Sequence, residues 1–470
     1  MADLELCYTP ATELAKRIRS RKISPVEIVK NALDRIAEVN PKLNCFCFVY
    51  PEEALKAARK AEAAVMAKKK LAPLHGIPVA IKDLTPTKGK RTTLGSYTHE
   101  HWVPDYNATV VDSLLNAGGI MVGKTTTPEF AYSSFCESPL WGTTRNPWNL
   151  ERTPGGSSGG AGSAVASGCI PVAEGTDMGG SVRIPASFCG LVGLKPSLGR
   201  IPLDLLPSVF DNISHFGPIT RTIDDARLFL SVTQGPDDRD IQSIPGPLDL
   251  DGPQPARIKG MKFALSMDLG FYYVDPEVEK AVKRAAAALK EAGATVEKVK
   301  LPWNQRVVDM WMEIWQVFMA AYFGHTLAKY RDKMDPFVVH LIEEGNKMSA
   351  ADYKRLEIER TKQWNEFRPI LAKYDALLCP TMALTAPKVG TGDAIFYEHS
   401  DDGFYHGLDI TCPFNNLAAC PALSVPAGWS RDGLPIGLQI VTRRWRDDTA
   451  LTIGKALEKA RPWADKRPPI

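Results

Sequence analysis

Two serines lie in glycine-rich turns between residues 152 and 185 of this chain. Ser157 belongs to the run Gly155-Gly156-Ser157-Ser158-Gly159-Gly160, and Ser181 ends the run Met178-Gly179-Gly180-Ser181. Glycine allows backbone N–H groups to face a ligand without an intervening Cβ. A serine in such a turn can attack a carbonyl carbon, and neighbouring N–H groups can stabilise the oxyanion that forms. The pattern therefore indicates acyl transfer through a serine nucleophile.

A serine hydroxyl has a high pKa and needs a neighbouring base before it can attack. Lys82 ends an apolar segment over 73–82, which we predict to be a buried strand. A lysine can act as a base when burial and neighbouring groups lower its pKa toward the working pH. A lone lysine at a strand end is more often exposed, because lysine is rarely buried. Lys82 is thus a candidate base only if the fold buries it.

Other chemistries fit the glycine-rich segment less well. No Lys-Ser/Thr pair closes it as in a P-loop, and no Gly-x-Gly-x-x-Gly opens a βαβ unit there. The string Gly155-Gly156-Ser157-Ser158-Gly159 matches the Gly-x-Ser-x-Gly pattern of α/β-hydrolases, but no apolar strand leads into it. A flexible linker is also disfavoured, because apolar segments flank the run.

Composition excludes several classes of function. Of the 470 residues, 44% are hydrophobic and 24% are charged, which is typical of a globular protein. The 57 basic and 54 acidic residues are too balanced to favour a nucleic-acid partner. The 9 cysteines show no metal-ligand spacing, and we expect reduced thiols and neither a metal nor an organic cofactor. No signal peptide or membrane span is predicted, so we expect a cytoplasmic protein.

Helical and strand patterns alternate along the chain, which indicates a layered α/β fold. Many of the predicted strands are continuous apolar runs, as is typical of parallel strands covered on both faces. A long helical stretch is predicted over 305–373, with breaks near Asp335-Pro336 and at Pro369. Its first part, residues 310–323, is rich in Trp, Phe, Tyr and Met.

Three blocks of this sequence together resemble the amidase signature family. They are Gly76–Asp83, Arg152–Pro185 and Asn415–Ala422, within a similarity that extends from about residue 8 to 460. The resemblance implies a Ser–cis-Ser–Lys triad for hydrolysis of a linear amide C–N bond. Ser181 would be the nucleophile, Ser157 the bridging serine after a cis peptide bond, and Lys82 the base.

The same resemblance implies roles for neighbouring residues. Backbone N–H groups from Met178 through Ser181, including those of Gly179 and Gly180, would form the oxyanion hole. Tyr132 and Ser133 align with a segment that borders the acyl pocket, so we expect them to contact substrate. Three residues are expected to support the site: Ser158 would stabilise the loop, Asp177 would orient the site or cap a turn, and Arg183 would form a structural ion pair.

The fold implied by the resemblance is a single amidase domain over 1–470. It would contain a large mixed β-sheet of about eleven strands flanked by helices on both faces. Its signature core would span about 70–230, and variable helices over about 303–373 would shape the substrate channel. The partners would be a small amide and water, and a homodimer is left open.

Two interpretations of the substrate remain. An aromatic stripe such as Met310–Phe323 is more often part of the protein core than of a pocket. A pocket there would favour a hydrophobic or aryl-bearing amide, anilide or carbamate as the substrate, as in a urethanase-like enzyme. The alternative is the glutaminase-type component of a tRNA-dependent amidotransferase, its A subunit, which shares the triad. That component usually carries an acidic residue near position 408, whereas Asp409 aligns one position away, which argues against glutamine. The complete Ser–Ser–Lys set disfavours a non-catalytic protein.

Overall fold

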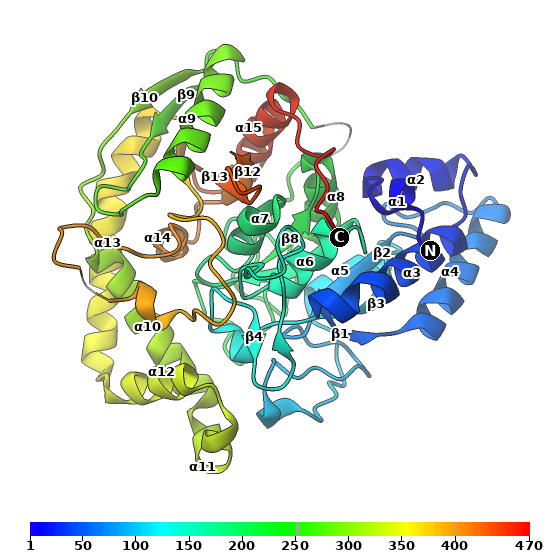
Figure 1. Cartoon of the computed structure of the whole chain (residues 1–470), viewed down its shortest axis with the longest axis horizontal. Helices are drawn as coiled ribbons and strands as arrows, with labels where there is room; N and C mark the ends of the chain where they lie inside the picture. The colour runs from blue at the N-terminus through cyan, green and yellow to red at the C-terminus, as the bar shows by residue number, and fades with distance from the viewer. Residues whose placement is uncertain (251, 253, 399) are drawn as a thin grey trace.

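The computed structural model describes residues 1–470 except 251, 253 and 399. Within these residues an eleven-stranded sheet has the order β1-β3-β2-β6-β8-β7-β12-β13-β11-β9-β10 and is flanked by helices (Figure 1). The predicted mixed sheet of about eleven strands is therefore confirmed. The strands of this sheet are β1 (Phe46–Val49), β2 (Pro78–Lys82), β3 (Ile120–Thr125), β6 (Val172–Asp177), β7 (Val192–Lys195), β8 (His215–Thr220), β9 (Lys262–Leu265), β10 (Thr295–Lys298), β11 (Ala376–Pro380), β12 (Ala422–Trp429) and β13 (Pro435–Thr442).

The direction of pairing differs from the sequence-based expectation. Strand β2 is parallel to β3 and β6, and β9 is parallel to β10 and β11, but the other pairs of this sheet are antiparallel. Strands β8 and β13 are nevertheless buried along their whole length. The parallel interpretation was therefore wrong for the centre of the sheet. A continuous apolar run indicates that both faces of a strand are buried, but it carries no information about strand direction. A separate hairpin pairs β4 (Glu137–Ser138) with β5 (Gly142–Thr143).

Local signals account for several helix boundaries. Helix α3 begins after Ser24, whose side chain forms a capping box with Glu27. Asp335 caps α12 through a 2.8 Å hydrogen bond from the Phe337 N–H, and Pro336 is the first residue of that helix, which confirms the predicted break. The helices are α1 (Leu4–Cys7), α2 (Ala11–Arg19), α3 (Pro25–Leu43), α4 (Pro51–Met66), α5 (Thr109–Asn116), α6 (Gly159–Ala166), α7 (Arg183–Cys189), α8 (Ile223–Thr233), α9 (Pro276–Glu291), α10 (Arg306–Phe323), α11 (Leu327–Tyr330), α12 (Pro336–Lys347), α13 (Ala350–Lys373), α14 (Pro413–Asn416) and α15 (Asp447–Ala460).

The predicted break at Pro369 is wrong, because α13 continues through this residue to Lys373. A proline inside a helix removes one hydrogen bond and costs about 3 kcal/mol. Phe367 and Leu371 on either side are buried, and their packing offsets this cost. Tertiary contacts here outweigh the local preference.

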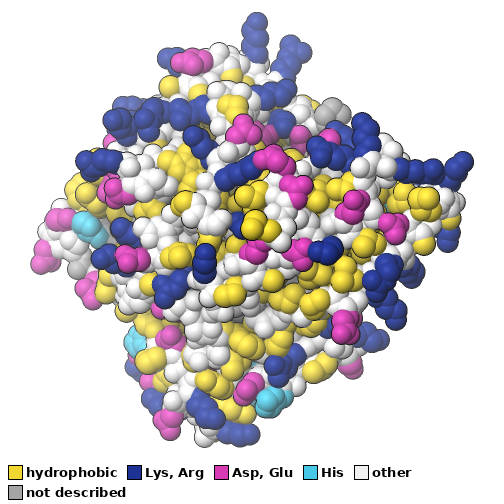
Figure 2. All heavy atoms as spheres, turned by 45° about the vertical axis from the view of Figure 1, so that its right-hand side comes forward, with side chains coloured by type: hydrophobic (Ala, Val, Ile, Leu, Met, Phe, Trp, Pro, Cys, Tyr) yellow, Lys and Arg dark blue, Asp and Glu magenta, His cyan; other side chains and the backbone are white. Residues whose placement is uncertain are grey.

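Helix α10 packs against both α12 and α13, and the three helices form the yellow-green lobe of Figure 1. The division into a signature core and channel helices stays a prediction. On the face shown in Figure 2, basic and acidic side chains are interspersed, as the balanced charge totals lead one to expect. No helix of the described chain is long and apolar enough to cross a membrane.

Candidate active site

Lys82 is completely buried at the end of β2. Its Nζ lies 2.6 Å from the Ser157 Oγ and 2.8 Å from the Thr176 Oγ1. Burial lowers the pKa of Lys82 to about 7, although the nearby Glu174 carboxylate opposes this shift. A lysine with a pKa near neutrality can be uncharged at working pH and can accept a proton.

Ser157 is also completely buried, and the Gly156–Ser157 peptide bond is cis. The next residue, Ser158, connects the loop to β6. Its Oγ accepts a hydrogen bond from the Thr176 N–H at 3.2 Å, and its own N–H donates to the Ser181 carbonyl at 3.2 Å. Ser158 thus joins the strand beside Lys82 to the turn that carries Ser181.

Ser181 is partly exposed and lines a small hollow just before α7. A proton relay needs two contacts, one between Lys82 and Ser157 and one between Ser157 and Ser181. The structure contains the first contact, but among the described residues no hydrogen bond joins the hydroxyls of Ser157 and Ser181. Tyr132 and Ser133 line the same hollow, and their contact with substrate stays a prediction. The Tyr132 hydroxyl donates to Asp335 at 2.7 Å, and Ser133 Oγ accepts from the Phe135 N–H at 2.8 Å.

The loop from Met178 to Ser181 has all four of its carbonyl groups engaged by donors outside the loop. In the part of the chain that the structure describes, the N–H groups of Gly179, Gly180 and Ser181 donate to no protein acceptor. Gly180 has φ +139°, and a Cβ there would lie 1.9 Å from the Thr411 hydroxyl, so glycine is required. Free N–H groups beside a serine hydroxyl are the donors that an oxyanion needs. Trp311 Nε1 donates to the Met178 carbonyl and Thr411 Oγ1 to the Gly179 carbonyl. The Ile184 N–H donates to the Gly180 carbonyl and the Ser158 N–H to the Ser181 carbonyl.

Asp177 and Arg183 form a buried, two-pronged ion pair behind this loop. Arg183 Nε donates to one Asp177 oxygen at 2.9 Å and Nη2 to the other at 2.8 Å. Asn415 Nδ2 donates to the same carboxylate at 3.0 Å. Burial alone would raise the pKa of Asp177, but the guanidinium holds it below its ordinary value. Arg183 does not line the hollow, so its contacts are those of a structural ion pair.

The Amidase family model matches residues 27–451 of the chain. This chain belongs to the amidase signature family. It is 38% identical to an acylamidase of Rhodococcus erythropolis, over all of this chain and 98% of the relative. It is also 35% identical to the A subunit of the glutamyl-tRNA(Gln) amidotransferase from Carboxydothermus hydrogenoformans, over 99% of this chain and all of the relative.

Solved structures agree with this assignment. A bacterial aryl acylamidase of the amidase signature family superposes with a TM-score of 0.91 at 29% identity, covering 97% of each chain. A 6-aminohexanoate cyclic dimer hydrolase superposes with a TM-score of 0.86 at 30% identity, covering 98% of this chain and 99% of the other. The protein is therefore an amidohydrolase that acts on amide C–N bonds.

Asp409 of this amidase lines the hollow beside Ser181, together with Trp311 and Trp315. The alignment argument against glutamine stays a prediction, while Asp409 itself belongs to the lining of the hollow. One of its oxygens lies 2.7 Å from the Thr411 hydroxyl oxygen, and burial raises the pKa of Asp409.

A cavity of about 310 Å³ adjoins the hollow, and Met178 lines both. Phe130 and Phe323 stack in its wall with ring centroids 3.9 Å apart. No lysine, arginine, aspartate or glutamate belongs to its described lining. The lining residues are Leu84, Pro86, Leu94, His99, Trp102, Tyr106, Phe130, Met178, Leu205, Leu206, Pro207, Phe318, Tyr322, Phe323 and His325.

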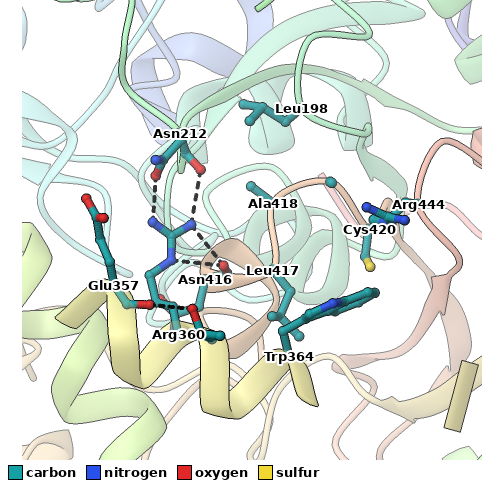
Figure 3. Close-up of a pocket in the computed structure, with 12 residues that line it drawn as sticks. Leu198, Asn212, Glu357, Arg360, Trp364, Asn416, Leu417, Ala418, Cys420 and Arg444 are labelled. Carbon is teal, nitrogen blue, oxygen red and sulfur yellow. Dashed lines mark hydrogen bonds between the residues drawn. The ribbon is translucent and has the colours of Figure 1, made fainter. Parts of the chain in front are cut away.

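A larger cavity, of about 410 Å³, lies between α13 and residues 416–420, and the triad candidates are not part of its lining (Figure 3). In Figure 3 the Arg360 guanidinium points at Asn212 and Asn416, to which it donates hydrogen bonds. The Cys420 thiol belongs to this lining, but burial raises its pKa to about 12, so it is not an activated nucleophile. This cavity therefore lacks the chemistry of the Ser181 hollow.

The sequence did not single out Glu174, Thr176, Trp311 or Thr411, all of which contact the candidate triad or its loop. Thr176 and Glu174 lie within the glycine-rich block, and their proximity to Lys82 follows from the parallel pairing of β2 with β6.

In the described part of the chain, no group of three or more His, Cys, Asp or Glu side chains is arranged to hold a metal ion.

Proposed function

We propose that this protein is a stand-alone amidase that hydrolyses hydrophobic or aryl-bearing amides, anilides or carbamates through an acyl-enzyme on Ser181. The observation that carries the proposal is the uncharged, aromatic-lined cavity next to the Ser181 hollow. An amide whose carbonyl lies at Ser181 can place an apolar substituent past Met178 into this cavity. Each buried methylene contributes about 0.8 kcal/mol to binding.

In the proposed mechanism, neutral Lys82 accepts the proton of Ser157, and Ser157 accepts the proton of Ser181. The Ser181 oxygen attacks the amide carbon and forms a tetrahedral intermediate. The N–H groups of Gly179, Gly180 and Ser181 stabilise its oxyanion, and loss of one such donor typically costs ~10²–10³ in rate. Ser157 returns a proton to the leaving nitrogen, the C–N bond breaks, and the acyl-enzyme remains. Water then attacks the acyl-enzyme with the same residues as base and acid.

The similarities to known proteins support this substrate class. The aryl acylamidase structure and the Rhodococcus acylamidase are named for aryl amides and acyl amides, and both align over nearly the whole of this chain. Aromatic side chains from α10 line both the hollow and the cavity, which supports the channel interpretation of Met310–Phe323 for Trp311, Trp315, Phe318, Tyr322 and Phe323.

Asp409 favours a second candidate, the glutaminase-type component of an amidotransferase. A carboxylate beside Ser181 can bind the amino group of glutamine, and relatives of that class share 35% identity with this chain. However, the described lining of the hollow contains no lysine or arginine to pair with the α-carboxylate of glutamine. The adjoining cavity is apolar, which also favours the hydrophobic amide.

The test is a hydrolysis assay of the purified protein alone, with a hydrophobic anilide, an aryl carbamate and glutamine as substrates. Ser181→Ala and Lys82→Ala serve as blanks. We expect turnover of the anilide or the carbamate that both blanks abolish. Turnover of glutamine alone, or activity that requires an added partner protein, would transfer the protein to the amidotransferase class.

A further inference from the structure

Trp311 reaches the oxyanion loop from α10, a helix outside the glycine-rich block. Its Nε1 donates to the Met178 carbonyl at 2.9 Å. Its ring lies directly against Gly179, where a Cβ would come within 2.3 Å of the indole Cζ2. Trp311 is buried and also lines the hollow that contains Ser181. It therefore contacts the loop by a hydrogen bond and by packing at the same peptide.

The hydrogen bond to Met178 orients a catalytic donor indirectly. The Met178 carbonyl and the Gly179 N–H belong to one planar trans peptide group, so they point in opposite directions. When Trp311 holds the carbonyl on one side, the Gly179 N–H faces the other side. Thr411 holds the Gly179 carbonyl at 2.6 Å in the same way, which orients the Gly180 N–H. Without the indole N–H, the first peptide of the loop loses this constraint.

The other side of Trp311 leads to the aromatic-lined cavity of about 310 Å³ through a continuous aromatic row. Trp311 stacks on Trp315 with centroids 6.0 Å apart, and Trp315 stacks on Phe318 at 4.7 Å. Phe318 contacts Tyr322 edge-on at 4.4 Å. Phe318 and Tyr322 line the cavity, whereas Trp311 and Trp315 line the hollow. One face of α10 thus connects two places: the proposed binding place of an apolar substituent, and the loop that would hold the oxyanion.

We propose that Trp311 is a positioning residue that orients the Met178–Gly179 peptide, and that an apolar substrate group packed against Phe318 and Tyr322 stabilises this orientation through α10. The inference rests on the proposed amidase function. Its consequence is that part of the binding energy of the apolar group is expressed in the transition state. An apolar substituent then raises kcat and does not only lower KM.

The experiment compares Trp311→Phe with a matched control, Trp303→Phe. Trp303 is buried, its Nε1 has no hydrogen-bond partner in the described structure, and it lines neither the hollow nor the cavity beside it, so only the first change removes a hydrogen bond. Two anilides are assayed, one with an acetyl group and one with a long apolar acyl group. We expect Trp311→Phe to lower kcat for the long substrate by at least about tenfold and to remove its kcat advantage over the short one. We expect Trp303→Phe to retain that advantage.

A second measurement does not depend on the choice of substrate. An arylboronic acid forms a tetrahedral adduct with a serine oxygen and places a boron-bound oxygen in the oxyanion hole. We expect its affinity to fall about tenfold in Trp311→Phe and to stay within about twofold in Trp303→Phe. Wild-type kcat and boronate affinity in a folded Trp311→Phe would overturn the inference, as would equal losses in the two variants. A wild-type enzyme that binds the boronate but turns over neither anilide would contradict the proposed substrate class and leave the boronate comparison as the test of Trp311.

Discussion

The Glu174 carboxylate accepts a hydrogen bond from the backbone N–H of Lys82 at 2.9 Å. Its second oxygen accepts from the Thr85 hydroxyl at 3.0 Å, so one buried acid holds the segment that follows β2. The negative charge of Glu174 also opposes the effect of burial on Lys82. Glu174 thus positions the candidate base and adjusts its proton affinity.

We expect kcat/KM to rise with pH through about 7, because Lys82 must be neutral to accept a proton and its pKa is about 7. Lys195 is a second buried lysine whose pKa burial lowers to about 7, so the wild-type profile alone does not identify the group. Glu174→Gln removes a charge that favours protonated Lys82, and the acid limb should move to lower pH. The profile is measured between pH 5 and 9 with the exposed Glu291→Gln as control. If the acid limb of the pH profile does not move in a folded Glu174→Gln variant, the titrating group is not Lys82.

Ser181→Ala should abolish turnover while leaving the fold intact, because the attacking oxygen is lost from a partly exposed position. We expect at least about a 10⁴-fold fall in kcat, as in other enzymes with an activated serine. Ser187→Ala is the matched control, since Ser187 is buried on α7 and its hydroxyl has no partner among the described residues. Anilide turnover by Ser181→Ala at more than a trace level would rule out this serine as nucleophile.

Arg183→Leu should destabilise the protein strongly, since it leaves the Asp177 carboxylate buried without its cation. Breaking a buried pair by removing one partner costs about 3–5 kcal/mol. Urea unfolding curves measure the free energy of unfolding, with the exposed Arg368→Leu as the reference substitution. Because the pKa of Asp177 is depressed in the folded state, its contribution to stability is present above the ordinary aspartate pKa and is lost as pH falls below it. A loss no greater than that of Arg368→Leu would show that the pair contributes little.

Tyr322→Ala should reduce the preference for large apolar substrates, because Tyr322 is a half-buried part of the cavity wall. Removing an aromatic contact worth about 1.5–3 kcal/mol predicts a rise in KM of about tenfold or more for a long-chain anilide. Acetanilide, whose acyl group does not reach past Met178, should show little change. Equal effects on both substrates would place the apolar substituent outside this cavity.

Features that depend on neighbouring residues could be predicted from the sequence. The glycine-rich turns around Ser157 and Ser181, the caps at Ser24 and Asp335, and the burial of strand β2 all follow from local residue types. The residue pattern by itself indicated a serine nucleophile, and the resemblance to the amidase signature family supplied the candidate triad. The break at Pro369 failed because packing of distant segments outweighed a local preference.

The tertiary structure alone decided which distant groups surround these serines. Glu174 and Thr176 contact Lys82 because β2 and β6 are neighbours, and Trp311 contacts Met178 because α10 packs beside the loop. Strand order and direction also depend on long-range packing, which an apolar run does not encode. The sequence thus determined the reactive side chains, whereas the fold determined their charge, their hydrogen bonds and the cavity beside them, since these arise from contacts between segments far apart in the chain.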